Sequence, residues 1–233
     1  MVELSKRLSC IASMITPGNV LCDVGTDHGY LPIAAVLSKR CPRALAMDVA
    51  QGPLEKAKNN IKKEQCEGLI ETRRSNGLME FHPSEADTVV IAGMGGMLML
   101  EILQASLEKL HQVKELILSP QLDMDQVRRF LIRHDFIIDG EAMIWEDEKY
   151  YMIFHVISGK EACPYTEEEY WYGRHLLAAK DQVLYAYLLR EKELLTHVQE
   201  NLAHQENTPA ITLRKEEIIV QLEYIAKALR YFQ

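Results

Sequence analysis

The chain has 233 residues, of which 48% are hydrophobic and 26% are charged, and its formal net charge is −8 at pH 7. This is the composition of a globular protein with a sizeable core. It excludes a membrane-spanning chain, because no apolar run approaches the roughly 18 residues required. The excess of acidic residues means that a nucleic acid would have to bind at a local basic patch. The N-terminus, "MVELSKRLSC", has no apolar signal segment, so we expect a cytoplasmic protein.

The cysteines and histidines give no sign of a disulfide framework or a metal site. Five cysteines are present without a C-x-x-C pair, and the eight histidines are scattered along the chain. An odd number of such cysteines is typical of reduced thiols in a folded core. We therefore expect free cysteines and no metal ion.

Three groups of basic residues could supply a patch for nucleic acid. They are Lys39 with Arg40 and Arg43, Arg73 with Arg74, and Arg128 with Arg129 and Arg133. Clusters of this size also occur on helix faces that are simply exposed to water. The sequence leaves both interpretations open for each group.

From the N-terminus to about residue 158, short apolar runs alternate with amphipathic stretches. Seven runs are typical of strands: NVLCDV, RALAMDV, LIETRRS, DTVVIAG, ELILSP, FIIDGEAMIW and YYMIFHVI. Four segments with helical periodicity lie among them: Tyr30–Lys39, Gly52–Glu64, Gly96–Leu110 and Met124–His134. This alternation predicts an α/β fold with a mainly parallel sheet covered on both faces. The last two runs are joined only by "EDEK", which predicts an antiparallel edge hairpin in a seven-stranded sheet.

Beyond Pro164 the strand signals disappear and the sequence becomes helical. Two stretches follow the four-three spacing of a coiled-coil seam, the first interrupted by Asp181 and Glu191. The apolar positions are Leu177, Leu184, Leu188, Leu195, Val198 and Leu202 in the first, and Ile218, Leu222, Ile225, Leu229 and Phe232 in the second. Asn207 and Pro209 supply turn chemistry between them. We expect a first domain over residues 1–160 and a coiled-coil-like helical hairpin over 161–233 that folds on itself. This favours a monomer, and dimerisation through the same helices stays open as the alternative.

The stretch "LCDVGTDHGYLP" joins the first predicted strand to the helix that follows it. In an open α/β sheet, ligands bind near such a connection, at the carboxyl ends of the strands. Gly25 permits a tight turn there, and Gly29 allows the backbone to approach a ligand closely. The acidic groups of Asp23 and Asp27 would repel a diphosphate, but they suit a ligand with a sulfonium and an ammonium group, such as S-adenosylmethionine.

Three further strand ends carry residues that suit the same ligand. Asp48, at the end of the second strand, is placed to accept hydrogen bonds from ribose hydroxyls. Asn76, after the third strand, could present its amide to an adenine edge. Gly93, Met94, Gly95 and Gly96 follow the fourth strand, beside the same crevice. The alternative is that these glycines and acids only form strand-terminal turns.

Together these motifs resemble those of one family. "DVGTDHGYLP", "MDV", "SNGL" and "IAGMGG" are similar to stretches of the bacterial tRNA adenine-N1-methyltransferases, closely over roughly residues 1–160 and in general character over the C-terminal helices. The resemblance implies a Rossmann-like class I methyltransferase domain that uses S-adenosylmethionine to methylate N1 of adenosine 22 in tRNA. It also implies that the C-terminal helices help to hold the tRNA. Asn76 departs from the Asp that many methyltransferases have there.

The resemblance implies a set of site residues. Those that would bind the cofactor are Asp23, Gly25, Thr26, Asp27, His28, Gly29, Asp48, Val49, Asn76, Gly77, Gly93 and Met94. Those that would meet the acceptor base are Gly95, Pro120 and Gln121, and the candidate catalytic residues are Asp27, His28 and Tyr30. Asp27 could steady positive charge on the base, or only cap the following helix or hold the cofactor. His28 could accept a proton or only bond the turn, and Tyr30 could stack on the base or only pack.

Other features bear on the acceptor and on rival functions. The sequence lacks the (D/N)-P-P-(Y/F) stretch of enzymes that methylate exocyclic amines, which favours a ring nitrogen. The aromatic segment "YWYGRH" (170–175) could stack on RNA or anchor the helical hairpin on the catalytic domain. Three rivals stay open: a methyltransferase with another RNA or small-molecule acceptor, a non-catalytic methyltransferase-like scaffold, and a nicotinamide dehydrogenase. The sequence lacks the G-x-G-x-x-G motif that a nicotinamide dehydrogenase usually has, which counts against the third rival.

Overall fold

The computed structural model describes residues 3–206 and 208–233. Asn207, for which the sequence predicts a role in the interhelical break, lies outside the described residues. The chain divides into two compact units, one ending at Ala162 and the other spanning Cys163–Gln233.

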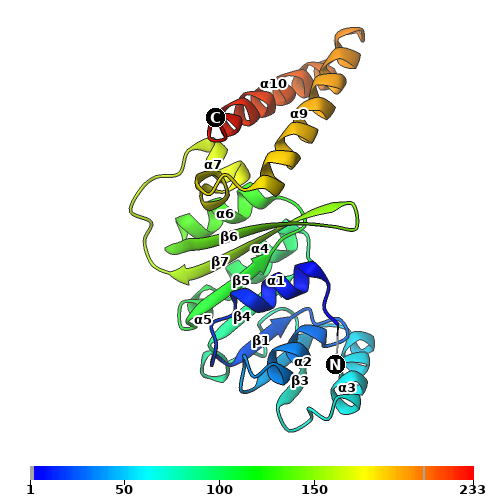
Figure 1. The fold of residues 1–233 in the computed structure, drawn as a ribbon, viewed down its shortest axis with the longest axis vertical. Helices are drawn as coiled ribbons and strands as arrows, with labels where there is room; N and C mark the ends of the chain where they lie inside the picture. Colours follow the sequence, from blue (N-terminus) through cyan, green and yellow to red (C-terminus); the bar gives the residue numbers. More distant parts are fainter. Residues whose placement is uncertain (1–2, 207) are drawn as a thin grey trace. The chain divides into compact units, whose positions relative to one another are not determined.

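The first unit is built on a seven-stranded sheet with the order β3-β2-β1-β4-β5-β7-β6 (Figure 1). The strands are β1 (Leu21–Val24), β2 (Ala44–Asp48), β3 (Ile70–Arg74), β4 (Thr88–Ala92), β5 (Glu115–Ser119), β6 (Phe136–Glu146) and β7 (Lys149–Ser158). Strands β1 to β5 pair in parallel, whereas β7 pairs antiparallel with both β5 and β6. The predicted mainly parallel sheet with an antiparallel edge hairpin is confirmed.

Helices cover this sheet on both faces. They are α1 (Lys6–Met14), α2 (Tyr30–Leu37), α3 (Gln51–Lys63), α4 (Gly96–Ala105), α5 (Leu107–Leu110) and α6 (Met124–Arg133). The segment predicted as one helix over Gly96–Leu110 is thus divided at Ser106. Between β3 and β4 the described chain forms only a short 3₁₀ turn, η1 (Pro83–Glu85).

One face of the sheet packs against α1, α2 and α3. Their buried side chains form a core with Leu21, Val90 and Ile117, which lie on β1, β4 and β5. Because side chains alternate along a strand, Asp23 and Ser119, two residues beyond Leu21 and Ile117, face the same side. These two polar groups therefore lie at the carboxyl ends of their strands, on the face that α1 covers.

The second unit contains α7 (Glu167–Tyr172), α8 (Arg174–Ala178), α9 (Gln182–Ala203) and α10 (Pro209–Arg230). The first predicted helical stretch is therefore three helices, because the backbone is left-handed at Gly173 and Lys180. Asp181 does not interrupt a helix but begins α9, accepting hydrogen bonds from the backbone N–H groups of Val183 and Leu184 at 2.9 and 2.8 Å.

The seam between α9 and α10 is shorter than its apolar spacing predicts. Leu184 and Leu188 of α9 are fully buried, as are Ile218 and Ile225 of α10. Farther along α9, however, Val198 is 36% exposed, so the apolar side chains in the outer part of this helix are only partly buried. The aromatic segment 170–175 contributes an anchor within this unit, since the Trp171 ring in α7 lies 5.9 Å from the Tyr224 ring in α10.

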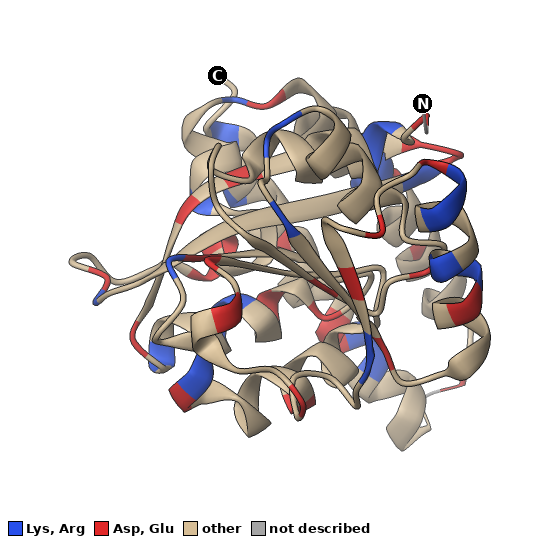
Figure 2. Ribbon diagram, turned by 90° about the horizontal axis from the view of Figure 1, so that it is seen from below, with Lys and Arg blue, Asp and Glu red and all other residues tan. Residues whose placement is uncertain are grey.

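The basic clusters are largely occupied by internal contacts. Arg128 is fully buried and its Nε donates to Glu141 at 2.8 Å, so it contributes to no surface patch. Arg73 donates to Glu85, and Arg40 donates to the Ile15 carbonyl oxygen at 2.6 Å. Basic and acidic residues are interspersed in the view of Figure 2. These observations favour the structural interpretation for one or more members of each cluster.

The cysteines of the described chain form no disulfide bonds with one another. The five cysteines are free, and Cys22, Cys41 and Cys66 are buried. The described residues contain no group of three or more His, Cys, Asp or Glu side chains that could hold a metal ion. Among the described helices, none combines the length and apolar character needed to cross a bilayer.

A buried polar network joins the strands at the end of the sheet opposite to Asp23. Glu115 Oε2 accepts from Thr16 Oγ1 at 2.6 Å and lies 2.9 Å from His155 Nε2. Against the effect of burial, hydrogen bonds from His155, Thr16 and Thr88 hold the pKa of Glu115 at about 2. The contact with Glu115 raises the pKa of His155 to about 9, and Asp139 adds to this effect. His155 is therefore charged at neutral pH, in an ion pair that ties β7 to β5.

This network predicts a loss of stability in alkaline solution. Because the pKa of His155 rises from 6.5 to about 9 on folding, its contribution is complete below pH 6.5 and is lost as the pH rises through 9. Between these values, the free energy of unfolding should fall by up to about 1.4 kcal/mol per pH unit. Urea unfolding at several pH values measures this slope. His155→Gln should flatten it, and an unchanged slope in that variant would show that other groups titrate.

Candidate functional site

The turn after β1 remains attached to β2 while it reverses direction. The backbone N–H groups of Gly25 and Thr26 both donate to the Met47 carbonyl oxygen, at 2.8 and 2.9 Å. Gly25 has a φ of 77°, and a Cβ atom there would lie 2.4 Å from Cε of Met94. The end of the flexible Met94 side chain would have to move to admit a Cβ atom, and the left-handed backbone is the stronger reason for glycine at this position.

Two later residues of the same turn are also left-handed, with φ of 63° at His28 and 70° at Gly29. We expected Gly29 to give a ligand access to the backbone, but its missing side chain faces α3 instead. A Cβ atom there would lie 3.2 Å from Cβ of Ala57. Asn60 of the same helix donates to the His28 carbonyl oxygen at 2.9 Å. The reason for Gly29 is thus the close packing of this turn on α3.

Asp23 is a buried carboxyl group at the centre of the predicted site. It is 8% exposed, and burial raises its pKa to about 6, with a further contribution from Asp48. The Thr26 hydroxyl partly opposes this rise, although Thr26 Oγ1 is buried and no hydrogen bond of good geometry engages it. Asp23 and Thr26 are therefore buried polar groups that can still form hydrogen bonds with a ligand.

The ends of β2 and β3 lie beside each other, as predicted. Asp48 Oδ1 accepts from the Ala50 N–H at 2.7 Å, and Arg74 Nε donates to the Val49 carbonyl oxygen at 3.0 Å. Asn76 is exposed after β3. At Gly77 (φ 55°) a Cβ atom would lie 3.0 Å from Ile102 of α4, so this glycine also serves close packing.

The segments after β4 and β5 continue to pair beyond the strands. Gly93 N–H donates to the Ser119 carbonyl oxygen at 3.1 Å, and Gln121 N–H donates to the Met94 carbonyl oxygen at 2.9 Å. Gly95 is the N-cap residue of α4. These bonds bring Gly93–Gly95 and Pro120–Gln121, the predicted cofactor and acceptor positions, to one edge of the sheet.

One of the glycines expected beside this edge, Gly96, packs against backbone. At Gly96 a Cβ atom would lie 2.3 Å from the Leu122 carbonyl oxygen, so any side chain would separate α4 from the loop after β5. The four-residue pattern G-M-G-G was a signal for such a position, but the pattern does not reveal which glycine is packed against backbone.

The three candidate catalytic residues lie together on the surface of this edge. Asp27 Oδ1 is 3.3 Å from His28 Nε2, and the Asp27 side chain is 67% exposed. The rings of His28 and Tyr30 are stacked, with centroids 5.2 Å apart and planes within 10°. The arrangement offers one carboxylate and a flat aromatic pair next to the turn of Gly25.

Arg7 of α1 is a residue of this edge that sequence reasoning missed. Its Nη1 atom lies 3.2 Å from the position of a Cβ atom on Gly93, and it is buried with no hydrogen-bond partner. Its guanidinium also lies 4.9 Å from the centroid of the Tyr151 ring. The sequence shows a charged helix here, but nothing local connects that helix to the end of β4.

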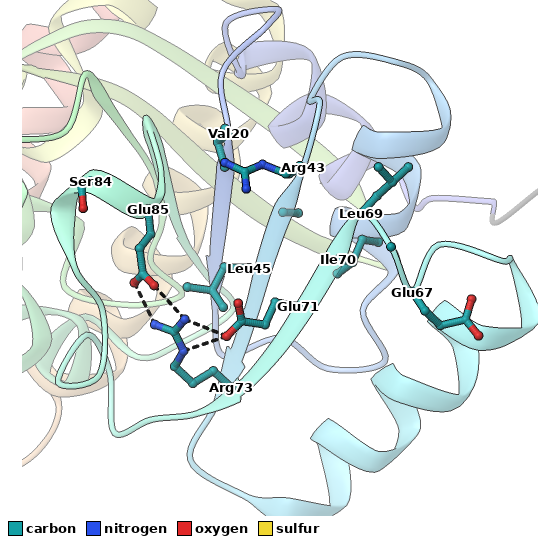
Figure 3. A pocket seen from close by; sticks show the side chains of 12 residues that line it. Val20, Arg43, Leu45, Glu67, Leu69, Ile70, Glu71, Arg73, Ser84 and Glu85 are labelled. Carbon is teal, nitrogen blue, oxygen red and sulfur yellow. Dashed lines mark hydrogen bonds and ion pairs between the residues drawn. The ribbon is translucent and has the colours of Figure 1, made fainter.

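A cavity of about 460 Å³ lies at the opposite end of the sheet (Figure 3). Val20, Arg43 and Leu69 line it, and each of them directly precedes a strand. The Arg73 guanidinium is held there by Glu71 and Glu85, with N–O distances of 2.7 Å to each. Because Arg73, Glu71 and Glu85 already pair with one another and ligands of such sheets bind at carboxyl ends, this cavity is a poor candidate for the functional site.

Comparison with known sequences identifies the first unit. Residues 4–154 match the family model described as "Methyltransferase domain". The tRNA (adenine(22)-N(1))-methyltransferase of Bacillus subtilis (strain 168) is 35% identical to this chain over 164 residues, which are 70% of this chain and 69% of the relative.

Solved structures are similar over nearly the whole chain. The crystal structure of the B. subtilis m1A22 tRNA methyltransferase TrmK has a TM-score of 0.89 at 28% identity, covering 98% of this chain and 99% of that chain. The structure of M. capricolum TrmK in complex with S-adenosylhomocysteine has a TM-score of 0.85 at 28% identity, covering 99% of each chain. The family model, the sequence identity to the B. subtilis relative and the similar structures agree. This chain therefore belongs to the tRNA (adenine(22)-N(1))-methyltransferase family.

Proposed function

We propose that this chain transfers the methyl group of S-adenosylmethionine to N1 of adenosine 22 in tRNA. The observation that carries this proposal is the meeting of Asp23, Gly25, Asp48 and Gly93 at one edge of the sheet. That edge is where a Rossmann-like sheet binds its ligand. Family membership supplies the acceptor, since the B. subtilis relative is named for adenine 22.

The residues present fit S-adenosylmethionine, which supplies a methyl group made electrophilic by a sulfonium. A positive group beside Asp23 would lower the raised pKa of that carboxyl group and keep it ionised. The unpartnered Thr26 hydroxyl lies in the same turn. Asp48, at the end of β2, would accept hydrogen bonds from ribose hydroxyls, while Val49, Asn76 and Gly77 would border the adenine of the cofactor. Met94, which reaches Gly25, would close the other side.

The chain's task in the reaction is chiefly to position the acceptor. Adenine N1 carries a lone pair and no proton, so it needs no general base to attack. As the new N–C bond forms, the electrons of the C–S bond remain on sulfur and the positive charge moves to the base. The Asp27 carboxylate would stabilise that charge. The stacked rings of His28 and Tyr30 would support the base, and Gly95, Pro120 and Gln121 would form the rim through which it enters.

The second unit would provide a further contact with tRNA. The target base must leave its stack, which costs a few kcal/mol that contacts elsewhere on the RNA have to offset. The outer half of α9, where side chains are only partly buried, offers exposed groups for such contacts. We place the enzyme in the cytoplasm, as expected for an enzyme of bacterial tRNA, and acting as a monomer because α9 packs on α10 of the same chain.

The function is tested by incubating the protein with labelled S-adenosylmethionine and unmodified tRNA, followed by mapping of the modified nucleotide. We expect one labelled 1-methyladenosine at position 22. A transcript with guanosine at that position is the control and should stay unlabelled. Label at a different nucleotide would reject the stated acceptor, and absence of label from every tRNA tested would reject the activity.

Asp27→Asn tests the role of the exposed carboxylate. Loss of the charge should reduce kcat by roughly 10-fold or more, because the cationic product is no longer stabilised, while affinity for S-adenosylhomocysteine should be unchanged. Single-turnover methylation and calorimetry measure the two quantities. Glu67→Gln, which removes an exposed carboxylate at the opposite end of the sheet, is the matched control. Lost affinity for the cofactor product in Asp27→Asn would assign this residue to cofactor binding instead.

Removal of residues 163–233 tests the role of the second unit. The core of α1, α2 and α3 on the sheet lies entirely within residues 11–153, so the shortened chain should still bind S-adenosylhomocysteine. Methylation of tRNA should fall on the order of 100-fold, since a few kcal/mol of binding is lost. Calorimetry and initial rates check the two expectations. Normal methylation by the shortened chain would mean that the helices have no part in holding the substrate.

A further inference from the structure

Arg7 carries a cationic donor that the protein itself leaves unsatisfied. Its backbone N–H donates to Glu146 at 3.1 Å, so that carboxylate holds the start of α1 and not the Arg7 side chain. Nη1 is buried without a hydrogen-bond partner, and no ion pair with a described carboxylate is found for this guanidinium. A buried, unpaired donor of a charged group is costly in a folded protein. Such a group indicates a missing anionic partner.

The guanidinium is placed at the edge where the cofactor would lie. It reaches from the Tyr151 ring of β7 to Gly93, which follows β4, and β5 lies between these two strands. Gly93 is followed by Met94, whose Cε atom is at the Gly25 turn. Arg7 Nη1, Gly93, Met94 and Gly25 thus form a continuous line from α1 to the end of β1.

We propose that Arg7 binds the carboxylate of the methionine part of S-adenosylmethionine through Nη1. The inference rests on the proposed function and adds to it a cofactor-binding residue. The methionine part has one ammonium and one carboxylate. Asp23 and Asp27 on the β1 side suit the positive groups but would repel the carboxylate. Arg7 supplies the complementary charge on the β4 side, and a guanidinium forms strong charge-assisted hydrogen bonds with carboxylates.

The charge of Arg7 argues against contact with the acceptor base. The base becomes positive as it is methylated, so a cation beside it would raise the energy of the transition state. The Tyr151 ring covers one side of the guanidinium and favours the cation there. A carboxylate is the partner that the reaction leaves unchanged in charge, and it can stay bound to Arg7 from substrate to product.

The test compares two ligands that differ only in this carboxylate. Binding of S-adenosylmethionine and of its decarboxylated analogue, which keeps the sulfonium and the ammonium, is measured by calorimetry with the full-length protein. Arg7→Ala should weaken S-adenosylmethionine by about 10- to 100-fold and the analogue by less than about 3-fold. Arg7→Lys should recover part of the lost affinity, because lysine restores the positive charge but not the paired donors of the planar guanidinium.

Two variants serve as controls for position and for packing. Lys6→Ala removes an exposed charge next to Arg7 on the same helix and should leave both ligands unaffected. Tyr151→Leu removes the ring beside the guanidinium but keeps the guanidinium, so S-adenosylmethionine should still bind more tightly than its analogue. Thermal melts of each variant show whether the fold is intact.

The remaining outcomes overturn the assignment in distinct ways. Equal weakening of both ligands in Arg7→Ala would give Arg7 a packing role. Unchanged affinity for both, with a raised KM for tRNA, would place Arg7 against the nucleic acid. If the unaltered protein binds neither ligand, the proposed function itself fails, and the role of Arg7 falls with it.

Discussion

Parallel pairing of β1 with β2 on one side and β4 on the other is the constraint on which the site depends. Asp23 is in register with Ala46 of β2 and with Val90 of β4. The shared register brings turns that follow residues 24, 48 and 92 to one edge, although they are far apart in the sequence. A slip of one residue would turn Asp23 to the other face and separate it from the groups that it meets. The apolar residues that hold the register therefore also hold the chemistry.

Glycines around this edge serve the packing of the protein as much as the approach of a ligand. Gly25 makes room for Met94, Gly29 for Ala57, Gly77 for Ile102 and Gly96 for the Leu122 carbonyl oxygen. Each contact joins a segment at this edge to a neighbouring segment or helix. A glycine-rich sequence motif thus partly reflects the close packing of one chain segment against another. It predicts which segments share one edge of the sheet, but it does not give the identity of the neighbour of each glycine.

The strands, their alternation with helices and the edge hairpin could be predicted because apolar runs and turn residues are local signals. The positions of Asp23, Asp48 and Gly93 followed, since the carboxyl ends of parallel strands share one edge. The neighbour of Gly29 and the place of Arg7 could not be predicted, because both depend on how α3 and α1 pack on the sheet. In the second unit, Asp181 was read as an interruption of a seam, whereas its carboxylate begins a new helix. A charged residue at such a position either interrupts an apolar seam or caps a new helix, and spacing alone does not distinguish the two.

Helix α3 contacts two parts of the proposed cofactor site. It begins just after Asp48, and farther along it supports the neighbouring turn through Ala57 against Gly29 and Asn60 against the His28 carbonyl oxygen. A shift of this helix when ribose hydroxyls engage Asp48 would carry the Asp27–His28 turn with it. One helix would then couple the ribose end of the proposed cofactor site to the turn that carries the candidate catalytic residues.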